Sequence, residues 1–217
     1  MDVDVNAFAV AVYHSAYLPV GGTTVEAIVW IRASVIDEPA VDVYLRLWMP
    51  LGATLALLRE VSPGTRDLRE TVTRLDERTV GCSAGRWTGG ARAYELGVTV
   101  PPRAVGDELL AARLVVAAAG KVVGRALVPV AWTDDERLVA ASTDSAVDSA
   151  RSAGVAATDL PTGRSRRPRH LLAAGPPAGV PCPNCGLRPQ EGDRFCEACG
   201  HELDADGGSE PLRNPAA

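Results

Sequence analysis

Four of the five cysteines in this 217-residue chain stand in two Cys-x-x-Cys pairs. The pairs are Cys182-Pro-Asn-Cys185 and Cys196-Glu-Ala-Cys199, and ten residues separate them. Each pair can supply two thiolates from one tight turn, and four thiolates form the tetrahedral shell that zinc takes in structural sites. Glycine follows each pair and permits the positive φ angles that aim backbone amides at the sulfurs. The spacing predicts one zinc ion held by Cys182, Cys185, Cys196 and Cys199.

This predicted zinc site is structural. Four cysteine ligands leave no coordination position for water or substrate, whereas a catalytic zinc ion keeps one position open. A module of about 25 residues is too short to fold by hydrophobic burial alone, so the metal would supply most of its folding free energy. Two alternatives stay open: a redox-active dithiol pair, although no thioredoxin-like βαβ pattern surrounds it, and His201 as a ligand in place of Cys199.

A second motif, Gly81-Cys82-Ser83-Ala84-Gly85, matches the G-x-S-x-G string of serine hydrolases. That motif needs a strand before the serine and a helix after it, but here a charged segment precedes it and a glycine-rich segment follows. The histidines beyond Ser83 are His170 and His201, and neither is well placed to act as its general base. We therefore expect a loop of small residues here, and a protein that is not an enzyme.

The segment that must position any site alternates between apolar and polar residues. From Val41 to Met49 every second residue is apolar, with Asp42, Tyr44 and Arg46 between them. Similar strands are predicted at residues 8–12, 25–33, 54–61, 70–76, 94–100, 109–118 and 122–132. This spacing is typical of a mainly β fold, an Ig-like antiparallel β-sandwich, which we place at residues 1–137.

The rest of the chain is predicted to be less ordered. Residues 138–180 lack Phe, Trp and Tyr and read as a flexible linker rich in Ala, Ser, Pro and Arg. A short helix is possible around residues 134–152, where Ala is frequent. The linker carries a basic cluster, Arg164–Arg169, which could contact phosphates, and Ser165, which could be modified. The zinc ribbon then occupies residues 181–203, and a disordered tail follows at 204–217.

Charge and hydropathy indicate where the protein works and what it binds. The net charge is −5, and no segment is basic enough to identify a nucleic-acid partner by charge alone. No stretch approaches the roughly 20 apolar residues of a membrane helix, and the first residues are acidic where a secretory signal would be basic. We expect a cytoplasmic protein without a membrane contact.

The surroundings of the zinc ribbon favour a protein partner. Arg188, Arg194 and Phe195 suit nucleic acid, yet four acidic residues lie among them, and four thiolates with one zinc ion add a charge of about −2. The leading hypothesis is a non-enzymatic adaptor or scaffold that binds proteins through the sandwich and the ribbon. The alternative is a nucleic-acid-associated regulator that uses the ribbon and the basic linker.

Several motifs of the predicted sandwich resemble actinobacterial von Willebrand factor A (VWA) domain proteins. Tyr17-Leu-Pro-Val-Gly-Gly-Thr-Thr-Val-Glu-Ala-Ile-Val29 resembles the segment that stands before the VWA domain in that family. The segment that follows the domain is similar to four motifs here: Val43-Tyr-Leu-Arg-Leu-Trp-Met-Pro50, Val61-Ser-Pro63, Val105-Gly-Asp-Glu-Leu-Leu-Ala-Ala-Arg113 and Val130-Ala-Trp-Thr-Asp-Asp-Glu136. The resemblance covers most of residues 8–137 and implies an intracellular scaffold with a binding role.

The VWA domain itself is not part of this resemblance. Only Ser34–Ala40 lies between Ala33 and Val41, where the family carries that domain, and the D-x-S-x-S string of its metal-adhesion site does not occur. The Mg²⁺ site of the family therefore cannot be carried over. What remains is similar to the β-sandwich that flanks the domain, joined to a zinc ribbon.

Overall fold

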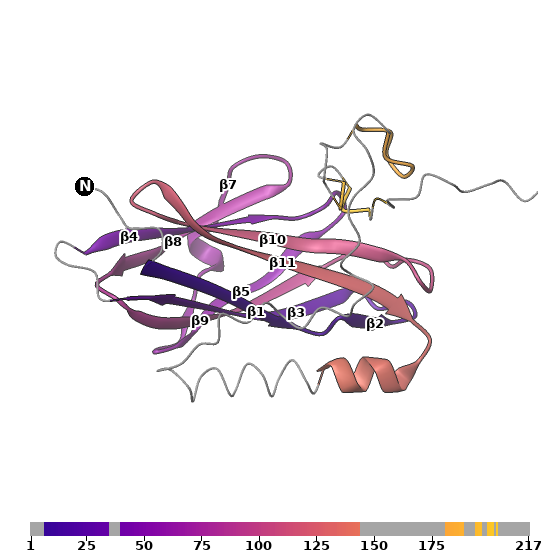
Figure 1. Ribbon diagram of the computed structural model, residues 1–217, viewed down its shortest axis with the longest axis horizontal. Coiled ribbons are helices and arrows are strands. Elements are labelled where there is room, and N and C mark those ends of the chain that lie inside the picture. Colours follow the sequence, from indigo (N-terminus) through magenta and orange to yellow (C-terminus); the bar gives the residue numbers. More distant parts are fainter. Residues whose placement is uncertain are drawn as a thin grey trace, which may run out of the picture.

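A computed structural model describes residues 7–34, 40–143, 181–188, 194–196 and 199–201, together with Leu203. Two β-sheets pack face to face, and the cysteine-containing segment lies over β10, on the outer side of its sheet (Figure 1). The predicted mainly β sandwich is thereby confirmed. Among the described residues, no helix combines the length and the apolar composition needed to cross a membrane.

The first sheet, sheet A, is antiparallel throughout. Its strands, in spatial order, are β1 (Phe8–His14), β3 (Thr24–Ala33), β9 (Gly90–Thr99), β5 (Thr54–Ser62) and β6 (Arg66–Asp67). The hairpin-like pairing of β1 with β3 matches the opening that the sequence predicts.

The second sheet, sheet B, is antiparallel except for the pairing of β2 with β11, which is parallel. Its strands, in spatial order, are β2 (Tyr17–Pro19), β11 (Lys121–Thr133), β10 (Glu108–Ala118), β4 (Val41–Trp48), β8 (Thr79–Trp87) and β7 (Thr73–Arg74). A 3-10 turn, η2 (Arg69–Thr71), lies between β6 and β7. Because β3 belongs to sheet A and β4 to sheet B, the chain crosses between the layers after Ala33.

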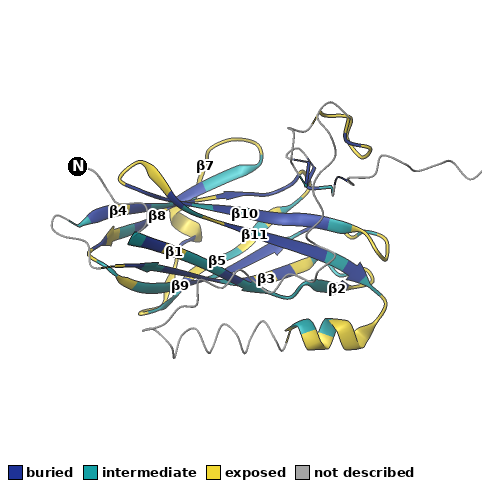
Figure 2. Ribbon diagram, viewed as in Figure 1, coloured by how far each residue is buried: buried dark blue, intermediate teal, exposed yellow. Residues whose placement is uncertain are grey.

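The core fills the space between the sheets (Figure 2). In β4 the inward residues Val41, Val43, Leu45 and Leu47 are buried, as their alternation predicts. Trp48 departs from this pattern, because it points to the outer face of sheet B and is nevertheless only 8% exposed. Something outside the sandwich must therefore cover it.

Two local predictions were wrong, and both concern the segment before and within β8. Residues 70–76 form η2 and the two-residue β7 instead of a strand, and the predicted loop at Gly81–Gly85 lies inside β8. The alternation of β8 is hidden because two of its inward residues, Cys82 and Ala84, are small. Gly81 is required there because a Cβ atom would approach the Tyr44 ring to 2.6 Å.

The segment after β11 begins as a helix. Residues 136–143 are helical, and the Asp135 carboxylate accepts a hydrogen bond from the Arg137 N–H at the helix start (2.9 Å). Ser142 Oγ lies 2.6 Å from Ser15 Oγ, which ties the helix to the loop between β1 and β2. This helix overlaps the start of the predicted linker at residue 138. The Arg164–Arg169 cluster, Ser165 and the 204–217 tail lie outside the described residues.

Candidate metal centre

The four predicted ligands converge on one point. The Sγ atoms of Cys182, Cys185, Cys196 and Cys199 all lie within 4.8 Å of one another. Cys182 Sγ is 3.6 Å from Cys199 Sγ, and Cys185 Sγ is 3.5 Å from Cys196 Sγ. Four sulfurs held about 2.3 Å from one zinc ion in a tetrahedron are about 3.8 Å apart, whereas a disulfide brings two sulfurs to about 2.05 Å. The spacing fits a shared metal ion and excludes a disulfide.

The two cysteine turns share two backbone hydrogen bonds and a glycine with a positive φ angle. In the first knuckle, residues 182–187, the Gly186 N–H donates to the Cys182 carbonyl and the Cys182 N–H donates to the Leu187 carbonyl, both at 2.8 Å. In the second knuckle, residues 196–201, Gly200, Cys196 and His201 make the same two bonds at 2.8 Å. Gly186 and Gly200 have φ angles of 73° and 71°, in the region where glycine is favoured. Both glycines therefore serve the turn that the sequence predicts.

Backbone amides surround the sulfurs. The Asn184 and Cys185 N–H groups point at the Cys182 thiol, but burial dominates there and raises its pKa. Burial also opposes ionisation of Cys199, yet hydrogen bonds from the Asn184 side chain and the His201 backbone outweigh it and lower its pKa. Such donors stabilise thiolates, the form that binds metal. Cys182, Cys196, Cys199 and Leu203 form a small core of their own, apart from the core of the sandwich.

The second knuckle is bonded to sheet B through its backbone. The last pair between β10 and β4 is Arg113 with Trp48, so β10 extends beyond its neighbour towards Glu108. In this gap the Leu110 N–H donates to the Gly200 carbonyl (3.0 Å), and Leu109 pairs antiparallel with His201. The knuckle thus pairs with β10 beyond the point where the pairing with β4 ends, and the Gly200 carbonyl satisfies the Leu110 amide.

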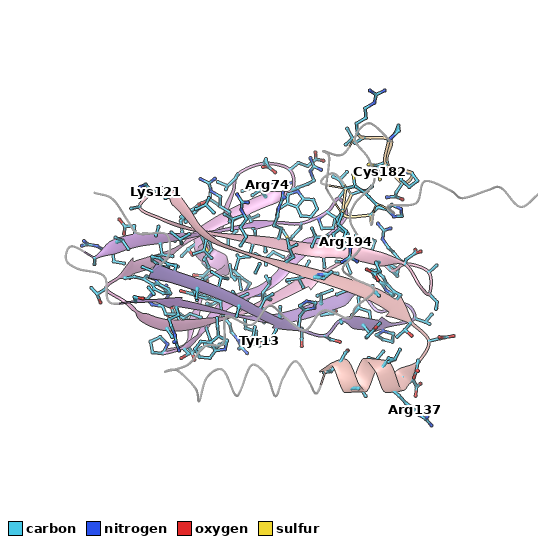
Figure 3. The ribbon with its side chains drawn as sticks, viewed as in Figure 1. Tyr13, Arg74, Lys121, Arg137, Cys182 and Arg194 are labelled. Atoms are coloured by element: carbon cyan, nitrogen blue, oxygen red, sulfur yellow. The ribbon has the colours of Figure 1, made fainter. Side chains whose placement is uncertain are left out.

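Side chains reinforce this contact. Phe195 packs on Trp48 and Leu110, with Leu127 at the margin, and it is the cover that the burial of Trp48 demands. Beside it, Arg194 Nη2 donates to Glu108 Oε2 at 3.0 Å, and both side chains are about nine-tenths buried. The labelled Arg194 lies between the cysteine segment and sheet B in Figure 3. We call Trp48, Leu110, Leu127 and Glu108 the ribbon seat.

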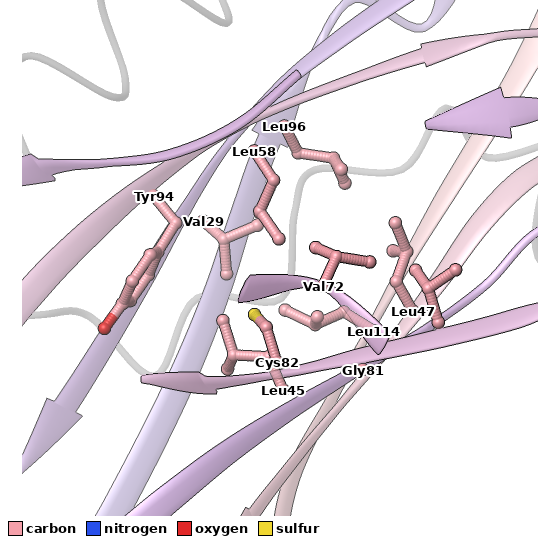
Figure 4. A pocket seen from close by; sticks show the side chains of 11 residues that line it. Val29, Leu45, Leu47, Leu58, Val72, Gly81, Cys82, Tyr94, Leu96 and Leu114 are labelled. Atoms are coloured by element: carbon pink, nitrogen blue, oxygen red, sulfur yellow. The ribbon is translucent and has the colours of Figure 1, made fainter. Parts of the chain in front are cut away.

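The fifth cysteine takes no part in this centre. Cys82 lies in the core on β8 and lines an apolar cavity of about 10 Å³ together with Leu45, Leu58 and Tyr94 (Figure 4). Burial raises the pKa of its thiol to about 11. Ser83 next to it lies within the strand and not on a strand-to-helix turn, so the G-x-S-x-G motif lacks the context of a nucleophile elbow.

Sequence reasoning found the four cysteines and missed the ribbon seat. One signal was available: Trp48 falls on the otherwise polar face of its strand, and an exposed tryptophan at such a place indicates a contact. The sequence does not show which segment covers Trp48, because the contacting residues are far apart in the chain: Glu108 and Arg194 are separated by 86 positions.

The fold and the cysteine cluster together define a β-sandwich protein with a docked module whose four cysteines could hold a metal ion. No protein-family model matches the chain, and no curated protein matches it. Among solved structures, the chain is similar to a von Willebrand factor type A protein from Catenulispora acidiphila, at 32% identity and a TM-score of 0.45. The match covers 47% of this chain and 25% of that chain, so this chain spans about a quarter of that length. That protein is of the type that the sequence motifs resemble.

Two further solved structures are more distant. The major pilin subunit of Bacillus cereus has 11% identity and a TM-score of 0.42, and the match covers 58% of this chain and 40% of that chain. The N-terminal domain of a Streptococcus gordonii adhesin has 12% identity and a TM-score of 0.43, with coverages of 58% and 32%. Neither supports an inference about function.

Proposed function

We propose that the protein is a non-enzymatic cytoplasmic adaptor that holds one structural zinc ion and binds protein partners. The observation that carries this proposal is the closed cluster of four cysteine sulfurs seated on a β-sandwich. A tetrahedral set of four thiolates suits zinc, or iron in a sulfur site, and zinc requires no redox partner. Cys182, Cys185, Cys196 and Cys199 would hold the ion, which would cross-link the two knuckles.

The first knuckle is the surface that we assign to a protein partner. The second knuckle faces sheet B, whereas Pro183, Asn184 and Arg188 are exposed and Leu187 is 55% exposed. The exposed leucine offers apolar surface to a partner, and arginine is enriched in protein interfaces. The proposed interface is therefore centred on Leu187.

The docked geometry weakens the alternative of a nucleic-acid regulator. Of the three ribbon residues that suit nucleic acid, Arg194 is paired with Glu108 and Phe195 is covered by Trp48 and Leu110. Arg188 alone of these three is exposed. One arginine makes a poor phosphate-binding surface, because affinity for nucleic acid grows with the number of phosphates neutralised.

The proposal is tested in two steps with the full chain. Elemental analysis should give one zinc ion per chain, and Cys196→Ser should lose it while the far-UV circular dichroism of the sandwich persists. Partners captured from a lysate by the zinc-loaded chain should be lost with Leu187→Asp and retained with Leu51→Asp, a matched change at an exposed leucine of the sandwich. Full zinc retention by Cys196→Ser would refute the site.

The non-enzymatic part of the proposal has its own test. Hydrolysis of an ester or phosphate panel by the purified chain, abolished by Ser83→Ala, would overturn it. Binding of a labelled DNA or RNA that weakens steeply with added salt would instead support the nucleic-acid regulator.

A further inference from the structure

The residues that close the second knuckle are also the residues that bind the sheet. The Gly200 N–H bonds to the Cys196 carbonyl, while the Gly200 carbonyl accepts from the Leu110 N–H. The His201 carbonyl accepts from the Cys196 N–H, while His201 pairs with Leu109. Both sets of contacts can exist together only when this turn has its knuckle conformation.

We propose that metal binding and docking of the ribbon on sheet B form one coupled equilibrium. Without a metal ion, the small core of three buried cysteines and Leu203 cannot hold the turn, because so short a module does not fold by burial alone. The ribbon then leaves its seat. Trp48, Leu110 and Leu127 become exposed, and so does the free edge of β10 next to Leu110.

Coupling of this kind is reciprocal. If the metal strengthens docking by some factor, docking strengthens metal binding by the same factor. Residues of the sandwich that never touch the metal should therefore set its affinity. Glu108 is such a residue, since it contacts the ribbon through Arg194 and lies on β10, remote in sequence from every cysteine.

The two knuckle glycines provide a matched pair of variants. Both have φ near +70°, so alanine introduces the same backbone strain at either position. A Cβ atom at Gly186 meets nothing within 4 Å, whereas at Gly200 it would lie 2.8 Å from Leu109 Cδ1 and 2.9 Å from the Leu110 carbonyl oxygen. Gly186→Ala thus strains a knuckle, and Gly200→Ala strains a knuckle and also pushes it off the sheet.

The test measures hydrogen exchange and zinc affinity on the full chain. Exchange at the Leu110 amide should be slow with zinc and accelerate when a chelator removes it, while amides at the β3–β9 pairing stay protected. By chelator competition, Gly200→Ala should bind zinc roughly tenfold or more weakly than Gly186→Ala, within the usual range of coupling between sites. Only Gly200→Ala should accelerate exchange at Leu110 with zinc bound.

A second variant keeps the inference open to refutation if Gly200→Ala does not fold its ribbon. Glu108→Ala should weaken zinc binding roughly fivefold or more, whereas Asp42→Ala, the same charge change at an exposed site on β4, should leave it unchanged. Equal zinc affinities for these two variants would overturn the coupling. So would a hydrogen-exchange rate at the Leu110 amide that does not change when the chelator is added.

The inference rests on the metal site of the proposed function, and the outcomes separate the two. A chain that binds no zinc refutes both the zinc site and the coupling. A chain that binds one zinc ion and keeps the Leu110 amide protected after chelation refutes the coupling alone, and the proposed adaptor stands.

Discussion

Cysteine occupies two environments in this chain, and they differ in what makes the sulfur unreactive. Cys82 is shielded by the core, where burial raises the pKa of its thiol to about 11. The four clustered cysteines would be shielded by the metal that they share. Removing the metal should expose the second group and leave the first unchanged.

Alkylation should therefore proceed in steps. At pH 8, iodoacetamide should modify no cysteine of the zinc-loaded chain, four after chelation, and all five in urea, because the thiolate is the reacting form and Cys82 remains protonated in the fold. Mass spectrometry of the modified peptides provides the count. Rapid modification of Cys82 in the folded chain would contradict the reading of its burial.

Zinc affinity should fall as the pH falls. The metal binds thiolates, and burial raises the pKa of Cys182 in the metal-free site, so that thiol carries a proton at neutral pH which zinc must displace. Competition titrations from pH 8 to pH 5 should show a steady loss of affinity, accompanied by proton uptake on release. An affinity independent of pH would mean that the sulfurs are not the ligands.

Gly81 offers a stability test within the sandwich. Alanine there would force the Tyr44 ring to move, because its Cβ would approach that ring to 2.6 Å, and overpacking of this kind costs about 1–3 kcal/mol. Urea unfolding should show that loss for Gly81→Ala. Gly64→Ala is the control, since a Cβ atom at Gly64 meets nothing within 4 Å.

At the scale of elements, β10 and β4 are offset, and the ribbon occupies the offset. Trp48 stands at its margin, with the Arg113 guanidinium 5.4 Å from the ring centre and Phe195 against it. If the ribbon leaves when the metal is removed, Trp48 alone among the four tryptophans should gain water at this place. Trp87 and Trp132 lie in the core between the sheets, and Trp30 packs with Ala93 of sheet A.

Tryptophan emission should report that change. Chelation should shift the emission of the wild-type chain to longer wavelength, and Trp48→Phe should abolish most of the shift while leaving the metal stoichiometry at one. The difference between the two chains isolates Trp48. A shift that persists undiminished in Trp48→Phe would place the change elsewhere.

The elements also show what a sequence can predict. β4 was predicted almost to the residue because its large inward side chains alternate with polar ones. β8 was missed because Cys82 and Ala84 are too small to mark its inward face, and because Gly81 on the other face leaves its space to the Tyr44 ring of the neighbouring strand. The cysteine cluster was predicted because the Cys-x-x-Cys spacing, which brings two sulfurs together in one tight turn, is visible in the sequence itself. The seat was missed because docking depends on distant residues and leaves no local period.

At the scale of the whole molecule, the sandwich has a complete core without the ribbon. All the buried residues of that core lie between Phe8 and Trp132. The ribbon adds contacts to an outer face, and those contacts cover apolar surface. The core of the sandwich therefore does not need the ribbon, whereas the ribbon packs on the surface that the sandwich provides.

A chain ending at residue 143 should test this asymmetry. It should keep the β-sheet circular dichroism and a cooperative thermal transition, yet bind a hydrophobic dye and self-associate more than the full chain, because Trp48 and Leu110 are uncovered. Dye fluorescence and size-exclusion chromatography measure both effects. An unfolded truncated chain would show that the ribbon is part of the folding unit.

β4 also separates the crossing between the two sheets from the ribbon seat. Val41 opens β4 next to the crossing from sheet A, and Trp48 closes it at the ribbon seat, roughly 23 Å away for an eight-residue strand. A foreign domain grafted between Ala33 and Val41 would enter at the end of the strand remote from the metal. The chain could then carry a fused domain at one end of β4 and keep the docked ribbon at the other end.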